Sequence, residues 1–236
     1  MRPAAVSSGR RLAPVVYDLL KERLLDGTYQ AGERLPVEEL KTELAVSKQP
    51  VMDALRRLAA DGLVEIIPQV GCRVPVYGPA DVADFFAIFG GMESAVAGVA
   101  AQRRTERQLA ELERVNARIG ALAEDPDAVA RSHGYRMLNR DFHAVIQDMA
   151  HSPVVAEISR RMWDMSDLLI NTSGVPLPLA NAVRERYADH ERVIAALRAG
   201  DVSAARTAMA AHVAGTVGII RSAPEHAARA SGGSRR

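Results

Sequence analysis

The sequence contains a single cysteine, Cys72, so an intramolecular disulfide is impossible. The basic N-terminus, MRPAAVSSGRR, lacks the apolar region of a secretory signal peptide. The formal net charge of +1 argues against a uniformly basic surface, although a local basic patch remains compatible with it. These absences favour a protein that works in the reducing cytoplasm.

Long apolar runs are also scarce, and none approaches the roughly 18 residues that a membrane-spanning helix needs. We therefore expect no membrane association. Hydrophobic residues make up 48% and charged residues 25% of the chain, which is typical of a soluble globular protein. Only 4% of the residues are aromatic, and alanine is abundant, which favours tightly packed helices.

Residues 10–77 alternate helix and strand signals. An apolar stripe from Leu12 to Leu25 predicts a helix that ends at Asp26-Gly27. Two shorter helices follow, joined by the turn Ala45-Val46-Ser47, and the runs LVEII and CRVPVY predict a hairpin around Pro68-Gln69-Val70-Gly71. This order predicts a winged helix-turn-helix, in which residues 37–56 form the helix-turn-helix.

From residue 80 onward the pattern is almost continuously helical. Prolines, glycines and capping residues divide it into six expected helices, at about 80–102, 105–123, 126–150, 152–171, 178–199 and 201–222. The small, polar and basic segment 223–236 is expected to be disordered. The predicted fold is therefore mostly α, with an N-terminal winged helix-turn-helix followed by an all-α helical bundle.

The second helix of a helix-turn-helix enters the major groove of DNA and presents its first residues to the base edges. Ser47 is expected to cap this helix and contact a phosphate, while Lys48 suits guanine or phosphate and Gln49 suits adenine. Arg56 and Arg57 are expected to bind the DNA backbone. The pattern alone equally fits a helix with solvated polar side chains.

Three of the six histidines occupy positions that suit a metal site. His143 follows Asn139 by four residues, which places both on one face of a helix. His190 and His212 lie within consecutive helices that must pack antiparallel across a short turn. Three imidazoles and one oxygen suit zinc, nickel or manganese. The alternative is that these are ordinary core or surface histidines.

The stretch ERLPVEELKTELAVSKQPVMDALRRLAADGLVEIIPQVGCRV resembles the N-terminal domain of GntR-type transcriptional regulators. Their recognition helix reads V-S-R-T-P-V-R-E-A-L, followed by R-L-x-x-x-G-L-V and a G-x-x-V wing, and the similarity covers about residues 12–76. Met52 stands where an arginine is usual, which predicts an unusual operator and weaker DNA affinity. The expected DNA-contacting residues are Arg34, Ser47, Lys48, Gln49, Arg56, Arg57, Gly71 and Arg73.

Residues 80–222 resemble the FCD effector domain of the FadR-type branch. LNRDFHAVIQDMAHSPVV resembles its metal-binding helix, and DHERVIAALRAGDVSAARTAMAAHV its closing helix pair. The resemblance implies a divalent metal held by Asn139, His143, His190 and His212. Phe89 stands where an arginine usually grips a carboxylate effector, so a larger or less polar effector, or an unused pocket, is expected.

These features predict a cytoplasmic regulator that binds double-stranded DNA at a palindromic operator and responds to a metal, a small-molecule effector or both. The resemblance implies a homodimer formed largely through the helical domain. An architectural or constitutive DNA binder is the alternative. A helical metal-dependent hydrolase fits less well, because the sequence has no H-E-x-x-H motif and no nucleophile elbow.

Overall fold

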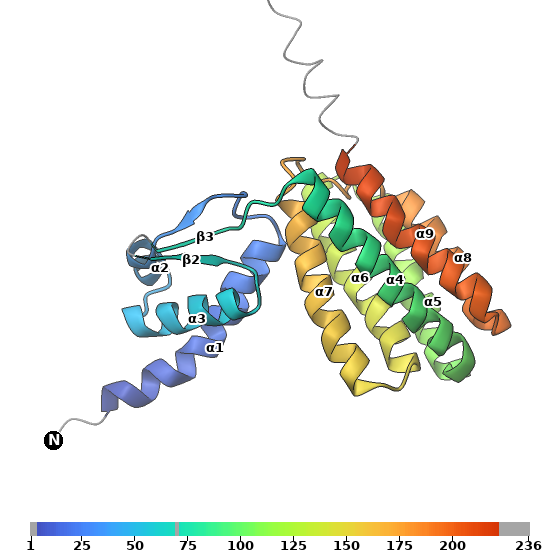
Figure 1. Cartoon of the computed structure of the whole chain (residues 1–236), viewed down its shortest axis with the longest axis horizontal. Helices are drawn as coiled ribbons and strands as arrows, with labels where there is room; N and C mark the ends of the chain where they lie inside the picture. Colours follow the sequence, from blue (N-terminus) through green and yellow to red (C-terminus); the bar gives the residue numbers. More distant parts are fainter. Residues whose placement is uncertain (1–3, 69–70, 222–236) are drawn as a thin grey trace, which may run out of the picture. The chain divides into compact units, whose positions relative to one another are not determined.

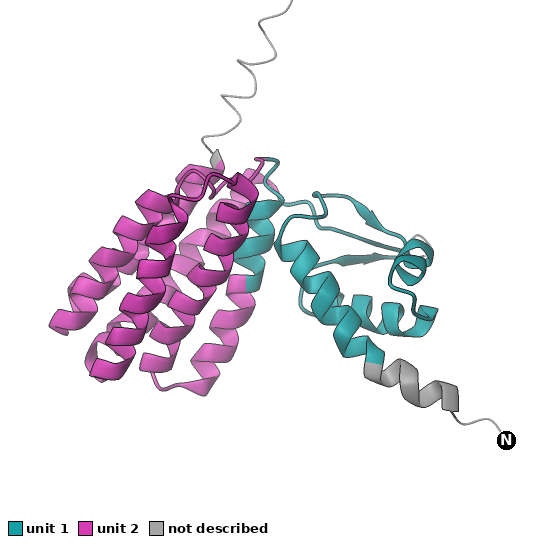
Figure 2. Cartoon of the chain, turned by 180° about the vertical axis from the view of Figure 1, so that it is seen from behind, with its two compact units in different colours: residues 1–77, 164–174 teal, residues 78–163, 175–236 magenta. Residues whose placement is uncertain are grey.

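The computed structural model describes residues 4–68 and 71–221, which are mostly α-helical as the sequence predicts (Figure 1). The chain divides into two compact units (Figure 2). The first contains the chain up to Tyr77 and also Asp164–Gly174, and the second contains Gly78–Trp163 and the chain from Val175 onward. The segment 223–236, which we expect to be disordered, lies outside the described residues.

The first unit is a winged helix-turn-helix. A three-stranded antiparallel sheet, in the order β1-β3-β2, accompanies its helices. The elements are α1 (Ala4–Leu25), β1 (Arg34–Leu35), α2 (Val37–Glu43), α3 (Lys48–Ala60), β2 (Glu65–Ile67) and β3 (Gly71–Arg73). The predicted order of helices and hairpin is confirmed. Strand β1 was not predicted from the sequence, because two residues are too few to show the alternation of a strand.

Helix α3 is fixed by its apolar side and its two ends. Val51, Leu55 and Leu58 are fully buried, and Pro50 lies in the first turn, where a helix tolerates it. Gly62 ends the helix with a left-handed φ of 79°, which suits glycine at this position. Ser47 occupies the expected N-cap position, but its hydroxyl makes no capping hydrogen bond.

The core of the first unit gathers apolar residues of α1, α3 and the wing, and it includes Leu168 of α7. Two polar contacts join the same part of α7 to α1. Lys21 forms an ion pair with Asp164 at 2.5 Å, and Asn171 donates a hydrogen bond to the carbonyl oxygen of Leu25 at 2.6 Å. Residues 164–174 therefore group with the first unit, whereas the sequence pattern assigned all of 80–222 to one helical domain.

The second unit is a bundle of helices. They are α4 (Pro79–Arg103), α5 (Glu106–Leu122), α6 (Ala128–Met149), the part of α7 (Pro153–Asn171) up to Trp163, α8 (Val183–Ala199) and α9 (Val202–Arg221). Helix α4 lies beside α9, α5 packs against α6 and α8, and α8 packs against α9 (Figure 1). Helix α8 begins later than the predicted residue 178, because prolines flank Leu177, which adopts a positive φ of 48°.

Helix α4 corrects the expectation that no segment is apolar enough to cross a membrane. It spans 25 residues and contains an 18-residue window with a mean hydropathy of 1.4, of which 39% is buried within the structure. Asp84 and Glu93 interrupt α4, so the helix contains no long uninterrupted apolar run despite its high mean hydropathy. One such helix is weak evidence for a membrane span, because core helices pass the same test.

Candidate metal centre and DNA-reading surface

The three predicted histidines converge inside the second unit. His143 lies on α6, His190 on α8 and His212 on α9, and their exposed fractions are 0%, 0% and 3%. One ring nitrogen from each lies within 4.8 Å of the other two. Nε2 of His143 is 3.3 Å from Nε2 of His212, and Nε2 of His190 has no hydrogen-bond partner among the described residues.

The Nδ1 atom of each histidine faces an oxygen atom. His190 Nδ1 is 3.2 Å from the Asn116 carboxamide oxygen, which suits a hydrogen bond. His143 Nδ1 lies 3.6 Å from a Glu93 oxygen, and His212 Nδ1 lies 3.6 Å from an Asp189 oxygen. The Asn116 acceptor favours a proton on Nδ1 of His190 and leaves the Nε2 lone pair of that ring available to a ligand, whereas the two separations of 3.6 Å are too long for hydrogen bonds.

Burial keeps the histidines uncharged. It lowers the pKa of both His143 and His190 well below the usual range, and the neighbouring His212 lowers them further. Burial also lowers the pKa of His212, although the carboxylate of Asp189 acts in the opposite direction. Since a histidine must be neutral to donate its lone pair, all three rings are suitable metal ligands near pH 7.

Aromatic contacts and a hydrogen bond to the backbone hold the cluster in place. The ring of Phe142 stacks on that of His190 with the ring centroids 3.8 Å apart. The ring centroids of Trp163 and His143 are 4.0 Å apart. The buried Arg186 donates to the carbonyl oxygen of His212 at 2.8 Å. A Cβ at Gly215 would lie 2.6 Å from this guanidinium, so a side chain there would displace Arg186.

The fourth predicted ligand, Asn139, is buried on α6, one turn before His143. Its carboxamide oxygen accepts a hydrogen bond from the Tyr135 hydroxyl at 3.1 Å. The sequence pattern does not reveal the acceptor oxygens that lie near the Nδ1 atoms, which belong to Glu93, Asn116 and Asp189. Asp189 precedes His190 directly and could have been noticed, whereas Glu93 and Asn116 belong to other helices and carry no spacing signal.

A second buried polar group adjoins the cluster. Glu93 is fully buried on α4 and accepts a hydrogen bond from Ser159, which accepts one from Gln147 at 2.7 Å. Burial raises the pKa of Glu93 to about 7, against the lowering effects of the Ser159 hydrogen bond and of Trp163. Phe89, one turn earlier, is buried against Trp163 with ring centroids 4.8 Å apart.

In the first unit, the predicted DNA-contacting residues of α3 lie at its exposed start and along one side. Lys48, Met52 and Arg56 follow one another at intervals of one turn, with Gln49 beside them. Lys48 lies 3.6 Å from Glu38, and Arg56 lies 3.3 Å from Asp53. These cations therefore already face carboxylates of the same unit.

The structure separates Arg57 from this group. Its guanidinium carbon lies 3.7 Å above the ring of Tyr17 on α1, and the Tyr17 hydroxyl donates to Asp61 at 2.7 Å. Arg57 also falls half a turn or so from the line through Lys48 and Met52. Arg57 is nevertheless exposed, and its contact with DNA alongside Arg56 stays a prediction.

Three further predicted residues lie in the sheet. Arg34 of β1 is exposed and opposite Arg73 of β3 in the strand register. Arg73 pairs with Glu65 at 2.8 Å. Gly71 begins β3 with a φ of 126°, a conformation that favours glycine, as the hairpin prediction requires. Residues 69–70 of the predicted wing turn lie outside the described part of the chain.

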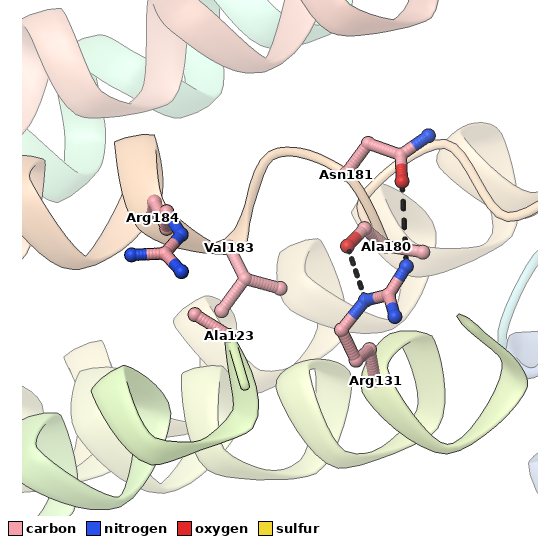
Figure 3. Close-up of a pocket in the computed structure, with 6 residues that line it drawn as sticks. All are labelled: Ala123, Arg131, Ala180, Asn181, Val183 and Arg184. Carbon is pink, nitrogen blue, oxygen red and sulfur yellow. Dashed lines mark hydrogen bonds between the residues drawn. The ribbon is translucent and has the colours of Figure 1, made fainter. Parts of the chain in front are cut away.

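A cavity of about 640 Å³ lies between α3 and the hairpin of β2 and β3. Its lining is mostly apolar and includes Met52, Leu55 and Ile66, with Lys48 and Arg56 among its charged members. A smaller cavity, of about 290 Å³, lies between Ala123, Arg131 and the start of α8 (Figure 3).

The arginines of the smaller cavity are engaged in holding loops together. Arg131 donates to the carbonyl oxygen of Ala180 at 3.0 Å and to Oδ1 of Asn181 at 3.4 Å (Figure 3). It also donates to the carbonyl oxygen of Asp125 at 2.7 Å. Arg184 pairs with Glu124 at 2.7 Å. These contacts join the segment before α6 to the segment before α8.

Comparisons with known proteins agree with this architecture. Residues 12–74 match the family described as bacterial regulatory proteins, gntR family, and residues 84–215 match the FCD domain. The transcriptional regulator McbR of Escherichia coli is 24% identical over 201 residues, covering 85% of this chain and 89% of McbR. The repressor GlaR of the same organism is 23% identical over 212 residues, covering 88% of this chain and 94% of GlaR.

Solved structures show the same fold. The structure of E. coli McbR/YncC has a TM-score of 0.75 at 23% identity and covers 89% of this chain and 96% of that one. A GntR regulator from Rhodococcus sp. RHA1 has a TM-score of 0.68 at 22% identity, covering 91% and 97%.

A winged helix-turn-helix joined to a helical bundle with a buried histidine cluster defines a DNA-binding transcriptional regulator rather than an enzyme. The chain belongs to the GntR family, with the C-terminal FCD domain of the FadR-type branch.

Proposed function

We propose that this GntR-family regulator binds a divalent metal ion through His143, His190 and His212, with Asn139 as an oxygen donor. We further propose that the metal, a small-molecule effector or both modulate its binding to operator DNA. The observation that carries the proposal is the convergence of three buried, neutral imidazoles. A buried polar atom without a partner, such as His190 Nε2, costs free energy that a bound ion would recover.

The donor set fits zinc, nickel or manganese. Imidazole nitrogen suits zinc and nickel, while a carboxamide oxygen is a weaker donor than a carboxylate and lowers the negative charge of the site. The hydrogen bond from His190 Nδ1 to Asn116 resembles those that orient metal-binding histidines elsewhere, and carboxylate oxygens of Glu93 and Asp189 lie 3.6 Å from Nδ1 of the other two rings. A bound ion would supply a fixed positive charge and open positions for a ligand.

The groups beside the histidines disfavour a simple organic acid as the effector. Phe89 is apolar and buried, and Glu93 carries a carboxyl group whose ionised form would repel another carboxylate. A larger, less polar or uncharged effector fits this environment better. A pocket without an effector, in which the metal alone acts, is the alternative.

On the DNA side, we propose that the start of α3 enters the major groove and that the wing contacts the backbone. Lys48, Gln49 and Arg56 are the expected contacts on α3, with Ser47 at a phosphate. Arg34, Gly71 and Arg73 are the expected contacts from the sheet. A homodimer would place two such surfaces on a palindromic operator, in the cytoplasm.

Helix α7 offers a route by which the two activities are coupled. Trp163 contacts the ring of His143 in the second unit, and the next residue, Asp164, pairs with Lys21 of α1 in the first. Restraining His143 by a bound ion would restrain Trp163 and bias the position of this helix. The change would reach α1, against which the recognition helix packs.

The testing experiment combines metal binding with operator binding. Zinc, nickel and manganese are titrated calorimetrically into metal-free protein, and binding to DNA fragments found by genome-wide mapping is then measured with and without the metal. His143→Ala, His190→Ala and His212→Ala should abolish metal binding and the metal effect on DNA affinity. His133→Ala, at an exposed histidine, is the matched control. Equal DNA affinity with and without metal or effector would indicate a constitutive regulator.

A further inference from the structure

Asp53 lies on the recognition helix but belongs to none of the DNA contacts named above. One of its carboxylate oxygens, Oδ1, accepts a hydrogen bond from the Gln49 carboxamide nitrogen at 2.9 Å. The same oxygen lies 3.3 Å from the Arg56 guanidinium. We propose that Asp53 is a specificity-determining residue that orients the Gln49 carboxamide to read adenine. The inference rests on the proposed placement of α3 in the major groove.

The orientation follows from the hydrogen-bonding capacity of a carboxamide. Gln49 has two N–H donors on Nε2 and one acceptor, Oε1. We infer that Asp53 takes the N–H that is anti to Oε1, which leaves the second N–H and the oxygen together on the opposite edge of the amide. That edge complements adenine, whose N6 amino group donates and whose N7 accepts in the major groove.

The same edge disfavours guanine, which offers two acceptors, O6 and N7, at these positions. Without Asp53, the exposed Gln49 side chain would rotate freely and could turn its donors toward either purine. Fixing the amide before binding removes this freedom and reduces the entropy that recognition must overcome. The expected consequence is a preference for adenine at one base pair of each half-site.

The neighbouring side chains support this reading of an A·T pair. Met52, three residues after Gln49, is apolar and partly buried at the cavity between α3 and the wing. An apolar side chain at this place suits the thymine methyl group, the only apolar feature of the major-groove edge. Arg56 offsets the negative charge of Asp53, which would otherwise repel phosphates.

A simpler role for Asp53 is that of a surface ion pair with Arg56, which would contribute little. The two roles differ in a measurable way. An ion pair that only adjusts the local charge changes affinity for all sequences equally, whereas an orienting group changes the ranking of bases at one position.

The test uses the full-length protein and selection from a random double-stranded DNA library, followed by affinity measurements on operators with each base at the selected position. Wild-type protein should prefer adenine at one half-site position by roughly tenfold or more, as expected for a bidentate contact. Gln49→Ala and Asp53→Ala should each reduce this preference to less than about threefold. Both sites are exposed or partly so, and circular dichroism verifies that the variants fold.

Two further variants separate orientation from charge. Asp53→Asn keeps an oxygen that can accept the Gln49 N–H but removes the charge, so it should retain most of the adenine preference. Glu38→Ala removes the carboxylate beside Lys48 without touching Gln49, and it should leave the preference unchanged.

The outcomes that contradict the inference are distinct. If Gln49→Ala loses the adenine preference and Asp53→Ala keeps it, Asp53 does not orient the amide, and the placement of α3 stands. If Asp53→Ala strengthens binding to all sequences equally, its role is purely electrostatic. If neither Gln49→Ala nor Lys48→Ala alters any base preference, α3 does not read bases, and both the inference and the proposed DNA contacts fail.

Discussion

The polar side chains proposed to contact DNA and those of the histidine cluster differ in their exposure and in their interaction partners. Lys48, Arg56 and Arg73 are at least partly exposed, and each lies near a carboxylate of its own unit. The three imidazoles are buried, and His190 Nε2 has no partner among the described residues. Exposed groups can exchange a carboxylate for a phosphate or water at little cost, whereas a buried, unpartnered nitrogen remains costly until a ligand binds.

This contrast indicates where ligand binding should affect stability. DNA binding exchanges one set of weak exposed ion pairs for another, so its strength depends on salt more than on any single contact. Metal binding fills an enclosed set of donors that already points inward, and it should therefore stabilise the helical unit directly.

The largest expected effect concerns metal binding itself. A metal ion at a hundred times its dissociation constant should stabilise the folded protein by about 2.7 kcal/mol, which corresponds to a rise in Tm of roughly 5–10 °C. Thermal unfolding of metal-free protein, with and without added zinc, measures this shift. His190→Ala should abolish it, and EDTA should reverse it in the wild-type protein.

The control for this measurement is His133→Ala, because His133 is an exposed histidine of the same helix as His143. It should show the full thermal shift. An equal shift in His190→Ala would mean that the metal stabilises the protein from another place, and the assignment of the cluster would then be wrong.

The second prediction concerns the hydrogen bond behind His190. Asn116→Ala removes the oxygen that accepts from His190 Nδ1 and should weaken metal binding by about 10- to 100-fold, which is typical of such supporting residues. Calorimetric titration measures the affinity. Asn116→Asp keeps an oxygen acceptor and should bind metal better than Asn116→Ala. If both variants bind as tightly as wild type, Asn116 does not orient the ring.

More of the winged helix-turn-helix than of the histidine cluster could be predicted from the sequence. The winged helix-turn-helix is confirmed because its signals are local: Pro50 opens α3, Gly62 ends it, and apolar residues recur at helical spacing between them. The approach of His190 to His212 followed from their positions on consecutive helices joined by a short turn, whereas the addition of His143 depended on the resemblance to the FCD domain.

The remaining features depend on contacts between distant segments, which spacing does not show. Asn116 reaches His190 from a helix 74 positions earlier in the sequence. The end of α7 groups with the first unit because Asp164 and Leu168 contact residues far away in sequence. Arg57 looked equivalent to Arg56 in sequence, and its stacking on Tyr17 became apparent only from the packing of α1.

The third prediction concerns the contact between α1 and α3. Tyr17 is buried, its hydroxyl donates to Asp61 at 2.7 Å, and burial together with Asp61 raises its pKa above the usual range. Tyr17→Phe leaves Asp61 without this donor but preserves the ring under Arg57. We expect a loss of about 1 kcal/mol in the free energy of unfolding, measured by urea denaturation. Tyr29→Phe, at a partly buried tyrosine of the same unit, is the comparison, and an equal loss there would argue against a special role for the Asp61 bond.

The smallest expected effect separates the two adjacent arginines of α3. Arg56 lies on the proposed DNA-contacting side, so Arg56→Ala should reduce the slope of log affinity against log salt by about one unit. Arg57 is stacked on Tyr17, so Arg57→Ala should leave the slope unchanged and instead lower the free energy of unfolding by about 0.5–1 kcal/mol. Fluorescence anisotropy at several salt concentrations, paired with urea denaturation, measures both quantities. Equal slopes for the two variants would mean that the angular position on α3 does not decide which arginine meets the phosphate backbone.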